Sequence, residues 1–309
     1  MGTESTTNVI SNITFLFYHY GKIPKYLEYA IEQVRIFNPS AEIYVITDGI
    51  KNTSRIDPFN VRQFEMGEFD SEELREFKNT YQHISCFKEK YERFVLERWF
   101  VTEIIRKQRP ERIYIMQDSD VAVFGMASDL LANLPDKTIC LSNRNPHFTF
   151  IKGDISRFLN FILGFYLDEN KLCAAKERFR LQNNPDHNIF NQGEMQFLFD
   201  YLDAAEDMCM YHTYTSAGYL DCNIHGSEGF ECMELRRRPR KKVFWRLEAG
   251  RLIPYFKKSD RLVKVFLLHF QGPGKRVFFR FSGDPFFRSK TGVWFLNQLF
   301  QKPLIANFS

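Results

Sequence analysis

Two aspartates spaced one residue apart are the sharpest chemical feature of the sequence. Asp118 and Asp120 follow a run of β-forming residues at 112–116, which predicts a strand. In an extended chain, residues i and i+2 point to the same side, so the two carboxylates repel each other unless a cation lies between them. Oxygen ligands suit Mg²⁺ or Mn²⁺. The pattern is consistent with a metal site and equally with a strand-ending turn that simply prefers Asp and Ser.

A second feature, much later in the chain, would complete such a site. His269 ends an apolar stretch and is followed by a glycine-rich turn with Gly272 and Lys275. Neutral imidazole binds divalent cations, glycines let backbone N–H groups approach phosphate oxygens, and lysine adds a point charge. Taken alone, the stretch is more typical of a buried histidine before an ordinary turn. Combined with the paired aspartates, it predicts a site for a metal-bridged diphosphate.

The elements that must position these residues alternate between strands and helices. A strand at 13–17, a helix at 25–37 and a strand at 42–46 are typical of the β-α-β unit of a parallel sheet. No G-x-G-x-x-G motif accompanies them, which argues against a dinucleotide site. Further along, the pattern predicts helix over most of 71–107 with an interruption near His83, strands at 112–116 and 139–141, mostly helix from 154 to 211, a loop-rich 218–229, and short strands with Phe-rich turns beyond.

Composition predicts a globular protein. The 309 residues are 44% hydrophobic, which is enough for a sizeable core, and no apolar run reaches the length of about 18 residues that spans a membrane. The polar start lacks the order of a secretory signal. Six scattered cysteines without a C-x-x-C pair argue against a zinc finger or a disulfide scaffold. We therefore expect a cytoplasmic protein.

The net charge of +4 hides an asymmetry. Residues 236–309 have 18 Lys and Arg against 3 Asp and Glu, whereas the remainder has 24 against 35. Six cations fall between Arg236 and Lys242, and clustered Phe and Trp follow them. A run of this kind is usually a solvated loop, and cations interleaved with aromatics suit contact with an anionic membrane surface better than nucleic-acid readout. No nucleic-acid motif is present, so nucleic acid is not an expected partner.

The order of these features resembles that of the GT-A glycosyltransferases, above all the retaining group that includes glycogenin and bacterial lipopolysaccharide galactosyltransferases. The resemblance covers roughly Ile13 to Arg276. It implies an α/β fold in which a Rossmann-like nucleotide-binding sheet has helices on both faces and continues into a more irregular acceptor half. The implied catalytic domain is 10–276, with a nucleotide-binding half at 10–125 and an acceptor and metal-completing half at 126–276, and a basic aromatic extension occupies 277–309.

The resemblance also implies roles for individual residues. Asp118, Asp120 and His269 are expected to hold Mn²⁺ (or Mg²⁺) on the diphosphate of a nucleoside diphosphate sugar. Gly272 and Lys275 are expected to contact its phosphates. Arg98 stands about twenty residues ahead of the paired aspartates, at the position of the family's arginine near the diphosphate or the donor sugar.

Departures from the family pattern affect the nucleotide and sugar contacts. Where the family has an Asp/Asn/Tyr group for uridine, this chain has Tyr18 and Tyr20 around a histidine. An aromatic ring can still stack on a base, so these two residues and Asp48 are the expected nucleotide contacts. The family's Asp-Gln segment is represented by residues 191–194, in which Gln192 matches, the Asp does not, and Glu194 is expected to take a related role. A helix N-terminus capped by Asn is the alternative.

These observations predict a glycosyltransferase that moves a sugar, expected to come from a UDP-sugar, to a hydroxyl of a glycan or a lipid-linked saccharide. Retention of configuration follows only from the resemblance. An inverting enzyme would need a carboxylate base, for which Glu194 and Asp221 are candidates. Asp221 is expected to line the acceptor pocket, or else to cap its own loop. The alternative function is a non-catalytic, membrane-associated binding protein on a decayed transferase scaffold.

Overall fold

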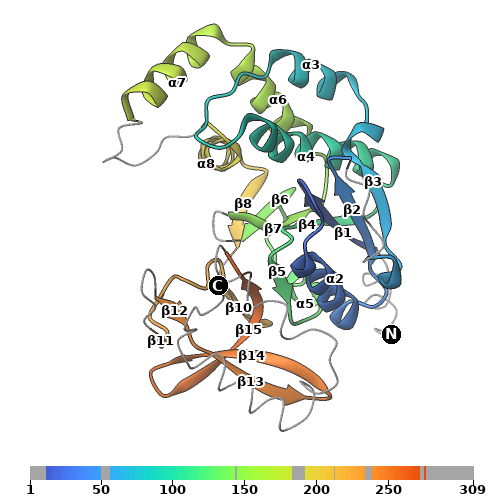
Figure 1. Cartoon of the computed structure of the whole chain (residues 1–309), viewed down its shortest axis with the longest axis vertical. Coiled ribbons are helices and arrows are strands. Elements are labelled where there is room, and N and C mark those ends of the chain that lie inside the picture. Colours follow the sequence, from blue (N-terminus) through green and yellow to red (C-terminus); the bar gives the residue numbers. More distant parts are fainter. Residues whose placement is uncertain are drawn as a thin grey trace, which may run out of the picture.

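The computed structural model describes residues 12–49, 56–142, 145–182, 192–211, 213–233, 239–271 and 275 (Figure 1). Its elements are, in chain order, β1 (Ile13–His19), α2 (Lys25–Phe37), β2 (Glu42–Thr47), η1 (Asp57–Phe59), β3 (Arg62–Glu65), η2 (Met66–Glu68), α3 (Glu72–Thr80), α4 (Glu89–Gln108), β4 (Ile113–Gln117), β5 (Val121–Val123), α5 (Ala127–Leu131), β6 (Ile139–Ser142), β7 (Asn145–Ile151), α6 (Ser156–Tyr166), α7 (Glu169–Gln182), α8 (Glu194–Ala204), β8 (Met208–Tyr211), β9 (Tyr214–Thr215), β10 (Gly218–Leu220), β11 (Cys232–Met233), β12 (Arg240–Lys241), β13 (Val243–Glu248), β14 (Arg251–Lys258) and β15 (Arg261–His269).

The central sheet contains seven strands of the described chain, in the order β3-β2-β1-β4-β7-β6-β8. Its first four strands are parallel, whereas β7 runs antiparallel to both of its neighbours. The predicted β-α-β unit is confirmed, and α2 has the predicted limits. The antiparallel β7 was not predicted. Because the parallel strands end at the same edge, residues that follow β1, β2 and β4 come together there.

Helix α2 shows why the sequence pattern was reliable in this region. Leu27, Ala30, Ile31 and Val34 are spaced at three and four residues, and all four are fully buried. Pro24 occupies the N-cap position with an extended backbone, where its missing N–H costs no helical hydrogen bond. The helix therefore presents one apolar stripe to the sheet and leaves its polar face to solvent.

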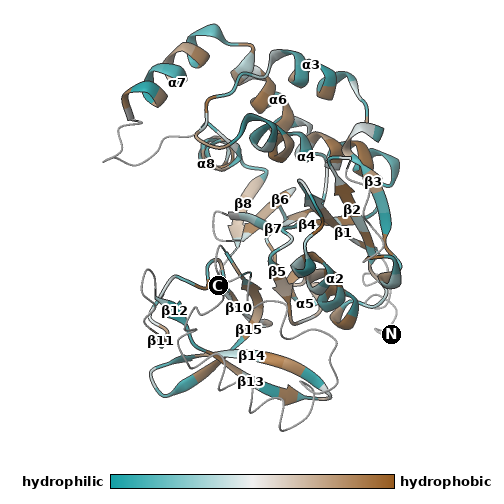
Figure 2. Ribbon diagram, in the orientation of Figure 1, coloured by the Kyte–Doolittle hydropathy of each residue, from teal (hydrophilic) through white to brown (hydrophobic). Residues whose placement is uncertain are grey.

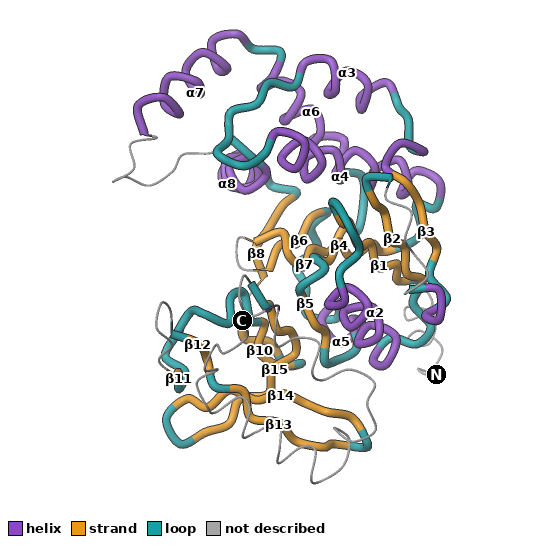
Figure 3. Tube along the Cα trace, viewed as in Figure 1, coloured by secondary structure: helices purple, strands orange, loops and turns teal. Residues whose placement is uncertain are grey.

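Two apolar clusters cover the two faces of the central sheet. Successive residues of β1 alternate between them: Phe15 and Phe17 belong to the cluster beneath α2 and the second sheet, and Leu16 and Tyr18 belong to the cluster beneath α3, α4, α6 and α8. Figure 2 shows apolar residues concentrated along the central strands, and Figure 3 shows most helices gathered on one side of the sheet. The predicted α/β fold with helices on both faces is confirmed. None of the described helices combines the length and apolar character needed to cross a membrane.

A second sheet, in the order β13-β14-β15-β10-β9, brings the end of the described chain to the edge of β5. The strand expected at 263–268 is confirmed as part of β15, whereas β13 and β14, which pair with it in a continuous antiparallel meander, were not predicted. The last of these strands pairs with β5, and His269 is the register partner of Val121. This pairing places His269 directly beside Asp120, although about 150 residues separate them in sequence.

Residue 193 must be glycine because a side chain of helix α4 lies too close to leave room for a Cβ atom. A Cβ atom added there would lie 2.0 Å from Oε1 of Glu92, a buried carboxylate that also accepts a hydrogen bond from the N–H of Glu194. We expect Gly193→Ala to lower the free energy of unfolding by about 1–3 kcal/mol. Gly164→Ala is the matched control: it lies inside α6 with open space around it, and should raise stability by about 0.5–1 kcal/mol. Urea unfolding of both variants tests the contrast, and equal shifts would contradict it.

Candidate metal and diphosphate site

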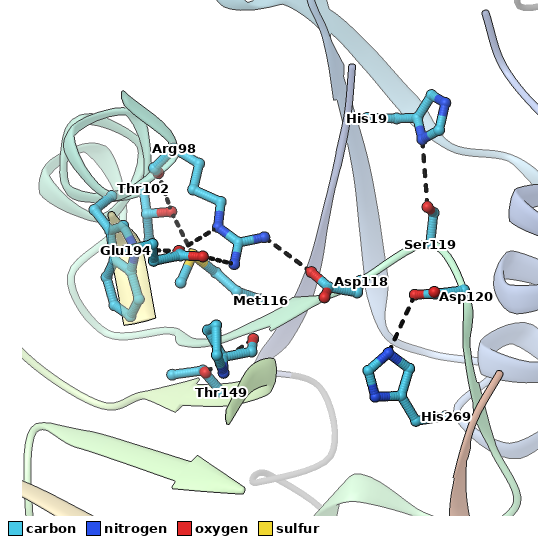
Figure 4. Close-up of polar contacts among 12 residues, drawn as sticks. His19, Arg98, Thr102, Met116, Asp118, Ser119, Asp120, Thr149, Glu194 and His269 are labelled. Atoms are coloured by element: carbon cyan, nitrogen blue, oxygen red, sulfur yellow. Dashed lines mark hydrogen bonds and ion pairs between the residues drawn. The ribbon is translucent and has the colours of Figure 1, made fainter. Parts of the chain in front are cut away.

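The structure brings the three predicted metal ligands together at the end of β4. Asp118 follows β4, Asp120 precedes β5, and the N–H of Val121 closes the turn by donating to the carbonyl of Asp118 at 3.1 Å. One ligand atom from each of Asp118, Asp120 and His269 lies within 4.8 Å of the other two. Figure 4 shows Asp120 facing His269 across this gap. Two carboxylates and an imidazole form a donor set that fits Mn²⁺ or Mg²⁺.

The imidazole of His269 is held rigidly. Its Nδ1 lies 2.7 Å from the carbonyl oxygen of Cys222, and because a carbonyl can only accept, Nδ1 carries the proton. Nε2 therefore faces Asp120, whose Oδ1 is 3.5 Å away. The ring also stacks on His147, with centroids 4.5 Å apart. Burial alone would lower the pKa of His269, but the hydrogen bond and charge of Asp120 raise it above the usual value.

Asp120 is an ionised carboxylate in a nearly buried position. Its burial would raise its pKa, but His269 and Lys275 outweigh that effect and lower the pKa to about 2. Nζ of Lys275 lies 3.0 Å from Oδ2 of Asp120 and 5.1 Å from the ring centroid of Tyr26. Asp120 therefore keeps a negative charge, which the nearby nitrogen groups of His269 and Lys275 balance. Gly272, the other predicted phosphate contact, lies outside the described residues.

Arg98 links the metal cluster to helix α8. Its Nε and Nη2 each donate to one oxygen of Glu194 at 2.7 Å, and Nη1 donates to Oδ1 of Asp118 at 2.9 Å (Figure 4). Burial would lower the pKa of Arg98, but the two carboxylates raise it. Burial raises the pKa of Glu194 to about 7 although Arg98 opposes the shift. Because Glu194 also accepts from the indole of Trp99, its carboxylate orients Arg98 rather than facing solvent.

Gln192 lies two residues before Glu194, just ahead of the N-cap of α8. Its backbone N–H donates to the carbonyl of Ile84 at 2.9 Å, and the residue is 4% exposed. Among the described residues, nothing forms a hydrogen bond with its Nε2. A buried polar group without a partner is costly and is characteristic of a site that a ligand completes.

The three predicted nucleotide contacts, Tyr18, Tyr20 and Asp48, lie in different surroundings. Tyr18 does not line the site: it is 6% exposed, and its hydroxyl pairs with Thr102 on α4 at 2.8 Å. The alternation of β1 explains this, since Tyr18 points toward the helices. Tyr20 lies at the end of β1 and packs edge-on against Tyr91, with centroids 6.0 Å apart. Asp48 lies at the end of β2 and accepts a hydrogen bond from the backbone N–H that follows Tyr20.

Asp221 does not face an acceptor pocket. It is 0% exposed, its Oδ1 accepts from Nζ of Lys241 at 2.6 Å, and its Oδ2 accepts from the backbone N–H of His269 at 3.2 Å. The carboxylate therefore fixes the backbone beneath the imidazole. Lys241 and its neighbour Arg240 are themselves buried, so neither is available to a membrane surface. The other arginines of the run, 236–238, lie outside the described residues, as does the proposed extension at 277–309.

Two histidines belong to the site without having been predicted. His19 ends β1, with Nδ1 3.3 Å from the hydroxyl of Ser119 and Nε2 3.1 Å from the carbonyl of Lys22. Burial lowers its pKa. His147 lies on β7 beneath His269, and burial followed by the charge of His269 holds its pKa well below the usual value. The strand end at His19 could have indicated the first, whereas no local motif marks the second.

No protein-family model and no curated protein sequence matches the chain. Among solved structures, it is similar to the glycosyltransferase GlyE of Streptococcus pneumoniae TIGR4, at 12% identity over 65% of this chain and 45% of that chain, with a TM-score of 0.34. It is also similar to mouse xyloside xylosyltransferase 1, at 11% identity over 70% of this chain and 88% of that one, with a TM-score of 0.45. A third is the galactosyltransferase LgtC in complex with donor and acceptor sugar analogs, at 11% identity over 94% and 96% of the two chains, with a TM-score of 0.44.

These solved structures are glycosyltransferases, the class that the sequence motifs resemble. The chain spans less than half the length of the GlyE structure.

Proposed function

We propose that the protein is a metal-dependent glycosyltransferase that moves a sugar from a nucleoside diphosphate sugar, with UDP as the expected nucleotide, to a hydroxyl of a glycan or lipid-linked saccharide. The observation that carries the proposal is the cluster of Asp118, Asp120 and His269 within 4.8 Å, at the edge where the parallel strands end. Residues 10–276 form the proposed catalytic domain. The pairing of β5 with β15 connects residues that we assign to the nucleotide-binding half with residues that we assign to the acceptor half.

The ligand atoms of Asp118, Asp120 and His269 suit a divalent cation, and the protonation states of Asp120 and His269 leave them ready to bind it. Asp120 is ionised, and the Nδ1 proton of His269 is committed to the carbonyl of Cys222, which leaves Nε2 as the coordinating atom. When bound, the cation would neutralise the charge that develops on the leaving diphosphate. Mn²⁺ is the ion we expect, with Mg²⁺ as the substitute.

The chain's own cations supply the rest of the charge control. Lys275, which pairs with Asp120, is positioned to shift its contact to a phosphate oxygen when the donor binds. Arg98 is fixed by Glu194, so its position beside Asp118 is preorganised for the diphosphate or the donor sugar. The Nε2 of Gln192, which has no hydrogen-bond partner among the described residues, is the group that we assign to a hydroxyl of the donor sugar.

The burial of the candidate bases supports a retaining outcome. An inverting reaction needs a carboxylate that faces the acceptor hydroxyl and takes its proton. Both oxygens of Glu194 are bound to Arg98, and Asp221 is 0% exposed and bound to Lys241. Neither proposed base is available, which removes the two candidates for inversion that the sequence offered.

Replacing Lys275 tests its phosphate role. We expect Lys275→Ala to weaken binding of the donor by about 1.5–3 kcal/mol, because a charge-assisted contact to phosphate is lost. Calorimetric titration with UDP and Mn²⁺ measures this directly. Lys264→Ala is the control, since that lysine lies on β15 and pairs with Glu248 at the surface. Equal affinities for both variants would remove Lys275 from the site.

Turnover of a donor without an acceptor tests the proposed function itself. We expect slow, Mn²⁺-dependent release of UDP from one member of a panel of UDP-sugars, abolished by a chelator and restored by added metal. A non-catalytic binding protein would bind the same donor and release nothing. Absence of both binding and release across UDP-, GDP- and ADP-sugars would contradict the proposal.

A further inference from the structure

Two cysteines outside the site face each other on neighbouring strands. Cys140 on β6 and Cys209 on β8 are register partners in a parallel pairing, and their Sγ atoms lie 3.5 Å apart. Neighbouring strands are about 4.8 Å apart. That spacing lies inside the range of about 4.4–6.8 Å between the Cα atoms of a disulfide. Side-chain rotation can therefore bring the sulfurs to bonding distance while the strands stay paired.

We propose that Cys140 and Cys209 form a reversible intramolecular disulfide by exchange with a low-molecular-weight disulfide such as oxidised glutathione. This inference is independent of the proposed transfer reaction. The two thiols differ in access, since Cys140 is fully buried whereas Cys209 is partly exposed on β8, which is one of the two outermost strands of the central sheet as described. A reagent in solution therefore reaches Cys209 first.

The surroundings favour Cys209 as the attacking thiolate. The hydrogen bond with Cys140 lowers the pKa of Cys209, burial opposes this, and the charges of Lys152 and Lys137 lower it further. The same pairing and burial raise the pKa of Cys140. Because a thiolate is the nucleophile in exchange, the partly exposed cysteine reacts and the buried one resolves.

The exchange is balanced in two steps. The Cys209 thiolate attacks one sulfur of oxidised glutathione, which forms a mixed disulfide and releases glutathione thiolate. Cys140 then gives its proton to solvent and attacks the Cys209 sulfur, which breaks the bond to glutathione and releases the second thiolate. Two protein thiols are oxidised, and one glutathione disulfide is reduced to two glutathiones. The new bond joins residues 69 apart in sequence and ties the edge strand to β6.

The test uses a variant in which the two exposed cysteines are removed, Cys86→Ser with Cys173→Ser, so that they do not react. The folded protein is incubated with oxidised glutathione, quenched with acid and analysed by mass spectrometry. We expect the intact mass to fall by two hydrogen atoms and digestion to yield a Cys140–Cys209 linked peptide. We also expect a higher midpoint of thermal unfolding, because the closed loop restricts the unfolded chain. Dithiothreitol should restore the starting mass.

Two further variants separate this mechanism from unspecific oxidation. In the same background, Cys140→Ser should leave glutathione trapped on Cys209 as a stable mixed disulfide, because the resolving thiol is absent. Cys209→Ser should leave Cys140 unmodified. A glutathione adduct that persists on Cys209 when Cys140 is present, no reaction at Cys209, or a link between Cys222 and Cys232 instead would each overturn the proposal.

Discussion

Asp120→Asn should lower the rate of UDP release from the donor by on the order of 10³-fold or more, because the variant loses an anionic metal ligand. Asp120 contacts two other residues of the site. Nε2 of His269 lies 3.5 Å from its Oδ1, and Nζ of Lys275 lies 3.0 Å from its Oδ2. The measurement is steady-state release of UDP at saturating donor and Mn²⁺. An effect of this size is larger than a loss of binding through one phosphate contact can produce.

The fold of this variant should survive. Asparagine has nearly the volume of aspartate, and Lys275, which is 37% exposed, can turn to solvent when its partner loses charge. Thermal unfolding checks this point. Asp203→Asn, an exposed aspartate on α8, is the charge-matched control and should leave turnover unchanged. Turnover within a few-fold of the unmodified protein in Asp120→Asn would show that the carboxylate is not part of the reacting site.

Lys241→Met should lower the free energy of unfolding by about 3–5 kcal/mol, because it leaves a buried carboxylate without its partner. Asp221 and Lys241 are both 0% exposed, and their charged atoms lie 2.6 Å apart. Lys241 also lies over the rings of Tyr219, Phe230 and Phe256, at 5.3 to 5.8 Å from their centroids. Urea unfolding gives the difference, and adding Asp221→Asn should recover part of the loss.

The next residue along the chain provides the matched control. Lys242 has the same side chain and pairs with a different carboxylate, that of Glu231, but its side chain is 26% exposed and that of Glu231 is 36% exposed. Lys242→Met should therefore cost about 0–1 kcal/mol, as exposed ion pairs do. If the two methionine variants lost equal stability, burial of the Asp221–Lys241 pair would not be the cause of the loss in Lys241→Met.

Sequence patterns predicted those parts of the fold and the site that depend on residues a few positions apart. The apolar spacing at Leu27, Ile31 and Val34 determined α2, and the type and spacing of Asp118 and Asp120 indicated a metal site, because both depend on residues a few positions apart. The proximity of His269 to Asp120 depends on pairing of β15 with β5. Sequence reasoning reached it by combining the metal-binding chemistry of the two motifs and through resemblance to a family, since no local pattern indicated the strand pairing.

Most of the wrong predictions concern residues whose surroundings depend on partners far away in the sequence. The charges at Arg240 and Lys241 looked like part of an exposed basic run, but the partner that buries Lys241 is Asp221, twenty residues earlier. Asp221 was misassigned for the same reason, since a loop aspartate gives no local sign of a buried lysine. Tyr18 could have been predicted correctly, because the alternation along β1 places it on the same side as Leu16, toward the helices. His147 is brought to the site by an antiparallel strand that no local signal identified.

Direct measurement of Mn²⁺ binding tests the central claim, which is that Asp118, Asp120 and His269 hold the cation that carries the donor diphosphate. Electron paramagnetic resonance of free Mn²⁺, titrated with the protein in the presence of UDP, reports the bound fraction without any need for turnover. We expect one Mn²⁺ bound per chain, tighter with UDP than without it, and binding that is lost in Asp120→Asn and weakened at least about tenfold in His269→Ala. Binding that is unchanged in both variants, or no binding by the unmodified protein at millimolar Mn²⁺ and UDP, would contradict it.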